Sequence, residues 1–168
     1  FKSQLINTLN FTFAYPKWGT IEGKYEVLNN YTYFKNLLPD SRLGPEELSD
    51  NIKKEEELVV TPEQYKGTVG YLKLRFSQQL DFWKFTLSNT AQYQQVSHDG
   101  DIDFKPLNVP EWNLRTSFLF SSQLFNKALY LQTGITAQYF TEFYADRYSA
   151  HLGEFISQNH TKIGKFPR

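Results

Sequence analysis

The sequence predicts an all-β protein, an antiparallel sheet of long amphipathic strands of the kind that forms a transmembrane barrel. Three observations support this prediction. Apolar and polar residues alternate along several long runs, the connections between the runs are alternately short and long, and aromatic residues gather at the ends of the runs. Of the 168 residues 17% are aromatic, and 18 Lys and Arg balance 18 Asp and Glu. So many rings in so polar a chain require a specialised surface.

The composition argues against several other classes of protein. No apolar run is long enough for a transmembrane helix, which needs about 20 such residues. A formal charge of zero argues against nucleic acid as a partner, because neutralising phosphates requires a basic surface. The chain has no Cys, which excludes a disulfide framework, a thiolate metal site and a Cys nucleophile.

Six alternating runs each predict one strand, since successive side chains of a strand point to opposite faces of the sheet. In the first run, residues 1–15, odd positions are mostly apolar and even positions mostly polar. The second run, residues 20–33, continues in the same sense after a turn at Pro16 to Gly19. The other runs are residues 72–79, 83–94, 114–124 and 129–143. Together they predict a sheet with one apolar and one polar face.

The connections between these runs alternate in length. Tight turns at Pro16 to Gly19, at Asp81–Phe82 and at Asn126–Lys127 make three hairpins. The connections after them are the long polar loops 36–65, 97–112 and 145–162. Outer-membrane barrels have short periplasmic turns and long extracellular loops, so we expect residues 1–168 to be part of a single barrel domain with these loops outside. Closure takes at least eight strands, so six are expected to be a fragment of a longer barrel.

Aromatic residues fall where a barrel has its two interfacial girdles. Trp18 and Trp83 lie near the predicted tight turns, whereas Tyr93, Trp112 and Tyr139 lie toward the long loops. A soluble barrel or sandwich with an aromatic core would give the same alternation. Strand length, loop asymmetry and ring placement together favour the membrane barrel.

The polar face carries the charged residues of the strands. If the apolar face meets lipid, these charges point into the lumen. The predicted lumen-facing charges are Glu22, Lys24, Glu26, Lys73, Arg75, Lys84, Arg115 and Glu142. Together with Lys2 they carry more positive than negative charge, which predicts a mild anion preference. The alternative is that the charges pair with one another and fill a closed interior.

Other motifs give weaker indications. Residues 98–103 carry three alternating carboxylates, which suit Ca²⁺ but depart from the EF-hand order and are more simply a solvated acidic loop. Pro45 suits the first position of a short helix on which Leu48 and Ile52 would share a face, against the default of a mobile surface loop. No catalytic, metal or cofactor motif stands out, so we expect no enzyme.

The second half of the chain carries an ordered series of local signatures. Asn108 to Glu111 leads into a strand, Leu124 to Leu129 forms a hairpin, and Gly153 to Phe155 and Ile163 to Pro167 follow. The series resembles the putative porin family of Bacteroidota-type outer membranes, and residues 29–34, 71–74 and 84–90 are also similar to it. The resemblance implies a β-barrel of the bacterial outer membrane without catalytic residues, and a place in the C-terminal part of a longer chain.

The function that we expect from these features is passive diffusion of small hydrophilic solutes through a water-filled lumen. The alternative is a structural or accessory barrel subunit of a larger outer-membrane complex, with its lumen plugged. The expected partners are the lipid bilayer and, in the second case, other outer-membrane proteins. No cofactor is expected.

Overall fold

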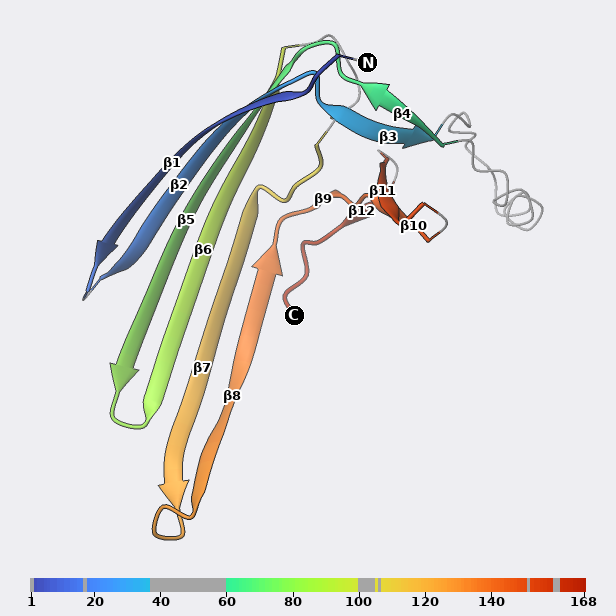
Figure 1. Cartoon of the computed structure of the whole chain (residues 1–168). Coiled ribbons are helices and arrows are strands. Elements are labelled where there is room, and N and C mark those ends of the chain that lie inside the picture. Colours follow the sequence, from blue (N-terminus) through green and yellow to red (C-terminus); the bar gives the residue numbers. More distant parts are fainter. Residues whose placement is uncertain are drawn as a thin grey trace, which may run out of the picture.

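The computed structural model describes residues 2–16, 18–36, 60–99, 105, 107–150, 152–158 and 161–168. Across these ranges the chain is built from β-strands (Figure 1). In the described ranges no helix is long and apolar enough to cross a membrane. The helix expected after Pro45 and residues 100–103 of the acidic loop lie outside the described residues.

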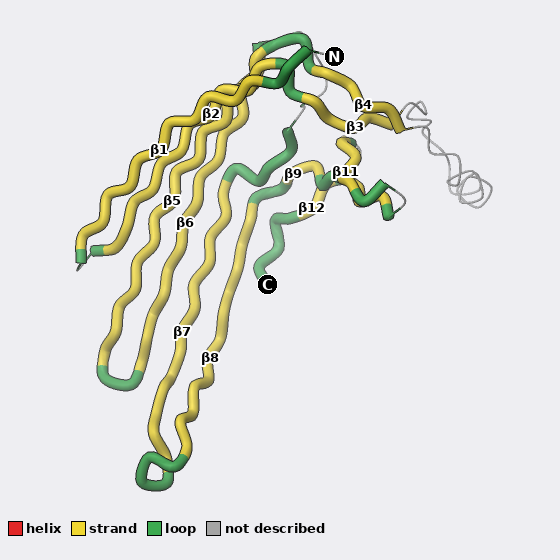
Figure 2. The backbone as a smooth tube through the Cα atoms, in the orientation of Figure 1, coloured by secondary structure: helices red, strands yellow, loops and turns green. Residues whose placement is uncertain are grey.

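Six long strands form the main sheet. They are β1 (Leu5–Tyr15), β2 (Gly19–Asn29), β5 (Thr68–Phe82), β6 (Phe85–His98), β7 (Trp112–Leu124) and β8 (Leu129–Phe140). Their order in the sheet is their order in the sequence, and all neighbouring pairs are antiparallel. The sheet is an open meander with β1 and β8 at its edges (Figure 2). An all-β antiparallel architecture is therefore confirmed, but the described strands do not close into a barrel.

The register of the sheet keeps apolar and polar residues on separate faces. Phe13 of β1 lies opposite Ile21 of β2, which lies opposite Phe76 of β5. One residue along, Thr12 lies opposite Glu22, which lies opposite Arg75. A slip of one strand by one residue would move its apolar residues to the polar face. The observed register contains no such slip, so the two faces predicted from the sequence are continuous across the six strands.

The apolar face has little protein cover. Leu9 is 68% exposed, Phe13 64% and Ile135 75%. It is formed by residues of all six strands, among them Leu9, Phe11, Phe13, Ile21, Tyr25, Leu74, Phe76, Leu80, Leu87, Leu114, Phe118, Leu129 and Ile135. Such a continuous exposed apolar surface marks a membrane or protein contact.

The three hairpin turns lie at one end of the sheet, which we call the tight-turn end (Figure 1). The second turn is Trp83–Lys84 and not the predicted Asp81–Phe82. Phe82 and Phe85 still pair across the ladder, and Trp83, which lies between them, has the left-handed φ of 56° that lets the chain reverse there. Asp81 therefore belongs to β5.

Short strands at the opposite, long-loop end form a second sheet, here called the loop sheet. Its strands are β10 (Arg147–Ser149), β11 (Glu154–Ser157), β3 (Thr32–Asn36) and β4 (Val60–Gln64), in that spatial order. β11 runs parallel to β3, with Ile156 beside Phe34, and so joins the first long connection to the third. A further pair is formed by β9 (Phe143–Tyr144) and β12 (Lys162–Ile163).

Two predictions for this end of the sheet differ from the structure: the extent of the second strand, and the absence of strands from two long loops. The second predicted strand is broken at Asn30, whose φ of 57° lies in the left-handed region that Asn tolerates, so Tyr33 belongs to β3. The predicted loops 36–65 and 145–162 contain strands of the loop sheet.

A packed core lies where the loop sheet meets the main sheet. Leu28 of β2, Val69 of β5, Tyr33 of β3 and the neighbouring Tyr65 are buried together. Leu28 and Val69 lie opposite each other on the polar face, because they keep the same parity as its charged residues. The loop sheet therefore covers the long-loop end of the polar face and not the apolar face.

Candidate functional site on the polar face

A group of charged residues lies in the middle of the polar face, over β2 and β5. This charge cluster consists of Glu22, Lys24, Glu26, Lys73 and Arg75. The register puts Lys24 directly opposite Lys73 and Glu22 directly opposite Arg75. Lys24 Nζ lies 2.8 Å from Glu26 Oε1, and Arg75 Nη1 lies 3.8 Å from Glu22 Oε2. One ion pair is thus close and the other is loose.

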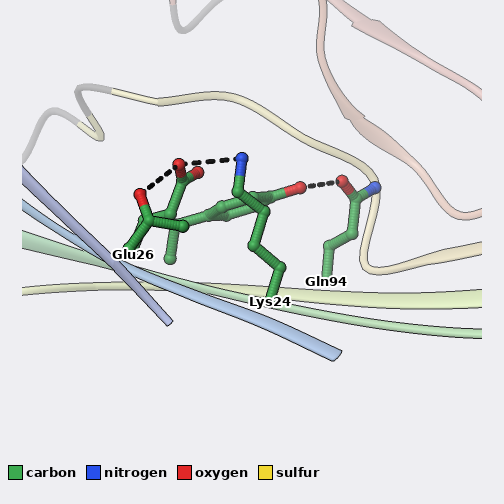
Figure 3. Close-up of polar contacts among 5 residues, drawn as sticks. Lys24, Glu26 and Gln94 are labelled. Carbon is green, nitrogen blue, oxygen red and sulfur yellow. Dashed lines mark hydrogen bonds and ion pairs between the residues drawn. The ribbon is translucent and has the colours of Figure 1, made fainter. Parts of the chain in front are cut away.

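Glu26 holds the most enclosed carboxylate of these pairs, with a side chain that is 18% exposed. Besides the ammonium of Lys24, it accepts a hydrogen bond of 3.2 Å from the hydroxyl of Thr8 on β1 (Figure 3). Both contacts are made on the same side of the sheet, so the polar face carries a connected network from β1 to β2.

A second polar network joins β5 and β6 to the segment that leads into β7. Tyr71 donates a hydrogen bond of 2.6 Å to Gln94 Oε1, and Gln94 Nε2 donates one of 3.0 Å to the carbonyl of Pro110. The backbone N–H of Gln94 also donates to the carbonyl of Glu111 at 2.8 Å. Gln94 is only 8% exposed, and these hydrogen bonds offset the free-energy cost of burying its polar amide.

The described residues of this face line a small and a larger hollow. A shallow depression of about 230 Å³ is lined by residues of β1, β2 and β5, including Lys24, Lys73 and Arg75. A larger one of about 400 Å³ lies between the end of β6, residues 105 and 107–111, and the β9–β12 pair. In its lining Lys162 Nζ lies 3.4 Å from Glu142 Oε1.

The structure distributes the predicted lumen-facing charges in two groups. Glu22, Lys24, Glu26, Lys73, Arg75 and Arg115 lie on the polar face by register. Lys84 lies in the tight turn, where its Nζ is 5.2 Å from the centre of the Trp83 ring. Glu142 lies after the end of β8, because that strand stops at Phe140. The sheet therefore brings the first group together and leaves these two outside it.

Asp81 belongs to the polar face but is absent from the prediction, which assigned it to the turn. Its Oδ1 accepts a hydrogen bond of 2.7 Å from Thr86 Oγ1 on β6, and its Oδ2 accepts one of 3.0 Å from Gln79 Nε2. The sequence did carry a signal for it, since Asp81 continues the alternation of Ser77 and Gln79.

The aromatic residues predicted as interfacial lie near both ends of the sheet. Trp18 is 70% exposed and Trp83 87% exposed, and both lie in tight turns. The rings of Tyr93 and Trp112 pack with centroids 5.0 Å apart where β6 and β7 approach the long-loop end, and Tyr139 lies opposite Leu114. Contact of these rings with lipid headgroups stays a prediction.

Metal ligation finds no support in the part of the chain that the structure describes, where His, Asp and Glu form no cluster of three. Of the acidic loop, Asp99 is described, and its Oδ1 accepts a hydrogen bond of 2.6 Å from the backbone N–H of Thr68. His98 packs edge-on against Tyr65, with ring centroids 6.3 Å apart. Both residues thus make structural contacts at the end of β6.

Long antiparallel strands with one exposed apolar face and one polar, charged face are typical of one class of protein, the outer-membrane channels, whose walls they form. The sequence model of the family described as putative porin matches residues 1–168, so the chain belongs to the putative porin family. Family membership supports a porin-like outer-membrane protein of the channel type. Comparison with curated proteins and with solved structures gives no match.

Proposed function

We propose that the chain forms part of the wall of a barrel in the bacterial outer membrane, through which small hydrophilic solutes diffuse passively. The observation that carries the proposal is the register, which keeps an exposed apolar face and a charged face apart across all six long strands. The apolar face would meet the lipid bilayer and the polar face would line the water-filled lumen.

The open edges of the sheet fit this assignment. In lipid, backbone N–H and C=O groups have no water to bind, so β1 and β8 need neighbouring strands that complete the ring. The backbone of Arg168 makes two hydrogen bonds of 2.8 Å with Gln138 of β8, which supports the pairing of this edge with further backbone. We propose that additional strands of the same barrel close the sheet.

The mechanism is diffusion along a charged wall, with no covalent step. Lys24, Lys73, Arg75 and Arg115 face the same side as Glu22, Glu26 and Asp81, so the described part of the wall carries a small positive excess. Charged rings of one sign set ion preference in pores. A mild preference for anions follows.

Planar-bilayer conductance of the intact protein tests the proposal, with reversal potentials measured across a salt gradient. Discrete conductance steps with a reversal potential of the sign for anions support it. A correctly folded barrel that stays silent, or one that prefers cations, contradicts the pore or its charge assignment respectively.

A second candidate function is supported by the core at the long-loop end. Leu28 and Val69 on the polar face are covered by Tyr33 and Tyr65, so packed side chains fill part of the space assigned to the lumen. A barrel plugged in this way would serve as a structural or accessory subunit of a larger outer-membrane complex. It would then co-purify with a partner in a fixed ratio, and the partner would protect part of the apolar face from labelling.

A further inference from the structure

We propose that the depression of about 230 Å³ on the polar face is a binding subsite for small solutes that carry a carboxylate or phosphate group, with Lys73 as its central contact. This inference rests on the proposed function, because it assigns the polar face to the lumen. It adds a local binding site to the general charge preference of the wall.

The first argument is the position of Lys73. It lies directly opposite Lys24 across the β2–β5 ladder, and like charges in directly opposite positions destabilise a sheet. The neighbour on its other side is Gln94, whose amide is already bonded to Tyr71 and Pro110. The fold therefore keeps two lysines directly opposite each other, and no described contact gives a structural reason for the second one.

The second argument is that the nearby carboxylates already interact with other groups than Lys73. Glu26 is bound by Lys24 at 2.8 Å and by Thr8 at 3.2 Å. Glu22 lies next to Arg75, at 3.8 Å. Within the described part of the chain, no ion pair or hydrogen bond holds the ammonium of Lys73. A bound anion would supply the missing negative charge.

The third argument is the chemistry of the lining. The distance of 3.8 Å between Arg75 and Glu22 is too long for a hydrogen bond, so the guanidinium keeps donors for another acceptor. Ammonium and guanidinium groups together bind carboxylate and phosphate oxygens with short, charge-assisted hydrogen bonds. The rest of the polar wall consists of the neutral side chains of Asn10 and Thr12 and the carboxylate of Glu22, which lies beside Arg75.

The size of the depression fits a small solute. Its volume of about 230 Å³ is several times the roughly 30 Å³ that one water molecule occupies in the liquid. The depression is open on the polar side, so a solute could enter and leave from the lumen. Such a weak, accessible site suits a pore, where binding must favour entry without preventing exit.

The experiment measures how inorganic phosphate, and separately succinate, reduces the KCl current through the intact protein in a planar bilayer. The variants are Lys73→Gln, Lys73→Arg and the matched control Arg115→Gln, which removes the same charge from the same face two strands away. Because a hydrogen bond to a charged group is worth about 1.5–3 kcal/mol, we expect Lys73→Gln to raise the half-blocking concentration roughly tenfold or more. Lys73→Arg should retain the block, and Arg115→Gln should change it little.

Two results would overturn the subsite. An equal loss of block in Lys73→Gln and Arg115→Gln would show that only the overall charge of the lumen matters. An unchanged block in Lys73→Gln would remove Lys73 from the binding of anions. Block by one anion and not the other would identify which of the two oxyanions the subsite prefers.

Equilibrium dialysis of radiolabelled phosphate against the detergent-folded intact protein separates this inference from the proposed function. If the barrel conducts no current but binds phosphate in a manner that Lys73→Gln weakens, the subsite stands and the pore does not. If the barrel conducts but neither blocks nor binds, the pore stands and the subsite does not.

Discussion

The hydroxyl group of Tyr71 donates a hydrogen bond of 2.6 Å to Oε1 of Gln94, on the polar side of the sheet (Figure 3). Gln94 passes the connection on to the carbonyl of Pro110, in the segment before β7. Three parts of the chain that are distant in sequence are thus fixed to one another by a single buried amide. This amide holds the segment 107–111 over the polar face.

Replacing Gln94 with Met should destabilise the folded protein by about 1–3 kcal/mol, because the hydroxyl of Tyr71 and the carbonyl of Pro110 would lose their hydrogen-bond partner. The Met side chain has nearly the same volume as Gln, so the packing would change little. Urea unfolding of the protein folded in detergent measures this difference. Gln92→Met, two residues away on the same face of β6, is the matched control and should cost much less. Equal effects of the two variants would contradict the role of the amide.

Two glycines should respond differently to Ala. A Cβ at Gly134 of β8 would meet the carbonyl oxygen of Phe118 and lie 2.9 Å from the Cα of Leu119, both of them backbone atoms that cannot swing away. At Gly23 it would meet the far end of the Phe11 ring, which is half exposed and can turn aside. We expect Gly134→Ala to cost about 1–3 kcal/mol and Gly23→Ala clearly less, measured by the same unfolding assay. The reverse order would show that Phe11 is held in place.

The stability of the loops should fall as the pH rises through the titration of Asp146. Burial raises the pKa of this carboxyl, although a hydrogen bond of 2.9 Å from Asn108 opposes the shift. The folded loop therefore retains the proton more strongly than the open loop, whose pKa is about 4. The stabilisation is complete below about pH 4 and is lost as the pH rises through the raised pKa. Burial, and after it the charge of Asp146, raises the pKa of the nearby Tyr31.

Hydrogen exchange of residues 107–111 and 145–150, corrected for the intrinsic effect of pH, measures this dependence. Asp146→Asn keeps an acceptor for Asn108 but removes the titration, so it should flatten the profile. Glu154→Gln, at an exposed position of β11, is the control and should leave the profile as in the wild type. A profile that Asp146→Asn does not change would assign the titration to another group.

Removing the ring of Tyr65 should loosen the loop sheet and raise the conductance of the pore. Tyr65 is 2% exposed and packs with Leu28 and Val69, so truncation to Ala should cost about 3–5 kcal/mol in the core that covers the polar face. Single-channel recordings test the effect. Tyr148→Ala removes a 57% exposed ring from the same loop sheet and should leave the conductance unchanged. A protease-sensitive loop sheet with unaltered conductance would show that it does not restrict the lumen.

Variants that retain only Trp83 or only Trp112 should report the two predicted membrane interfaces. Trp83 is 87% exposed at a tight turn, and Trp112 is 44% exposed at the other end of the sheet. In reconstituted vesicles, bromine near the headgroups should quench the fluorescence of both more strongly than bromine in mid-chain, because indole rings favour the interface. An absence of quenching in either variant would remove that residue from its girdle.

The main sheet could be predicted from the sequence because its strands depend on a local signal. The alternation around Phe13, Phe76 and Phe118 encodes both the strand and the face that it exposes. The turn between β5 and β6 was misplaced by two residues, because the aromatic pair Phe82 and Phe85 continues the ladder and a bulky Trp83 takes the left-handed conformation usually given to Gly or Asn.

The loop sheet could not be predicted, since its parallel pairing of Phe34 with Ile156 depends on a contact between two separate loops. The same is true of the charge cluster: the sequence places Lys24 and Lys73 on the polar face, but only the register shows that they lie directly opposite each other. The pairing of Glu22 with Arg75 and of Glu26 with Lys24 also had no signal in the sequence.

The contrast between the two sheets has a consequence for the order of assembly. Each ladder of the main sheet forms between strands that are neighbours in the sequence, so hairpins can be added one after another at a low entropic cost. The pairing of β3 with β11 has to wait until the strands between them have brought Phe34 and Ile156 to the same end. In the proposed barrel, the long strands would therefore enter the bilayer first, and the loop sheet would cover the long-loop end of the lumen as a late step of maturation.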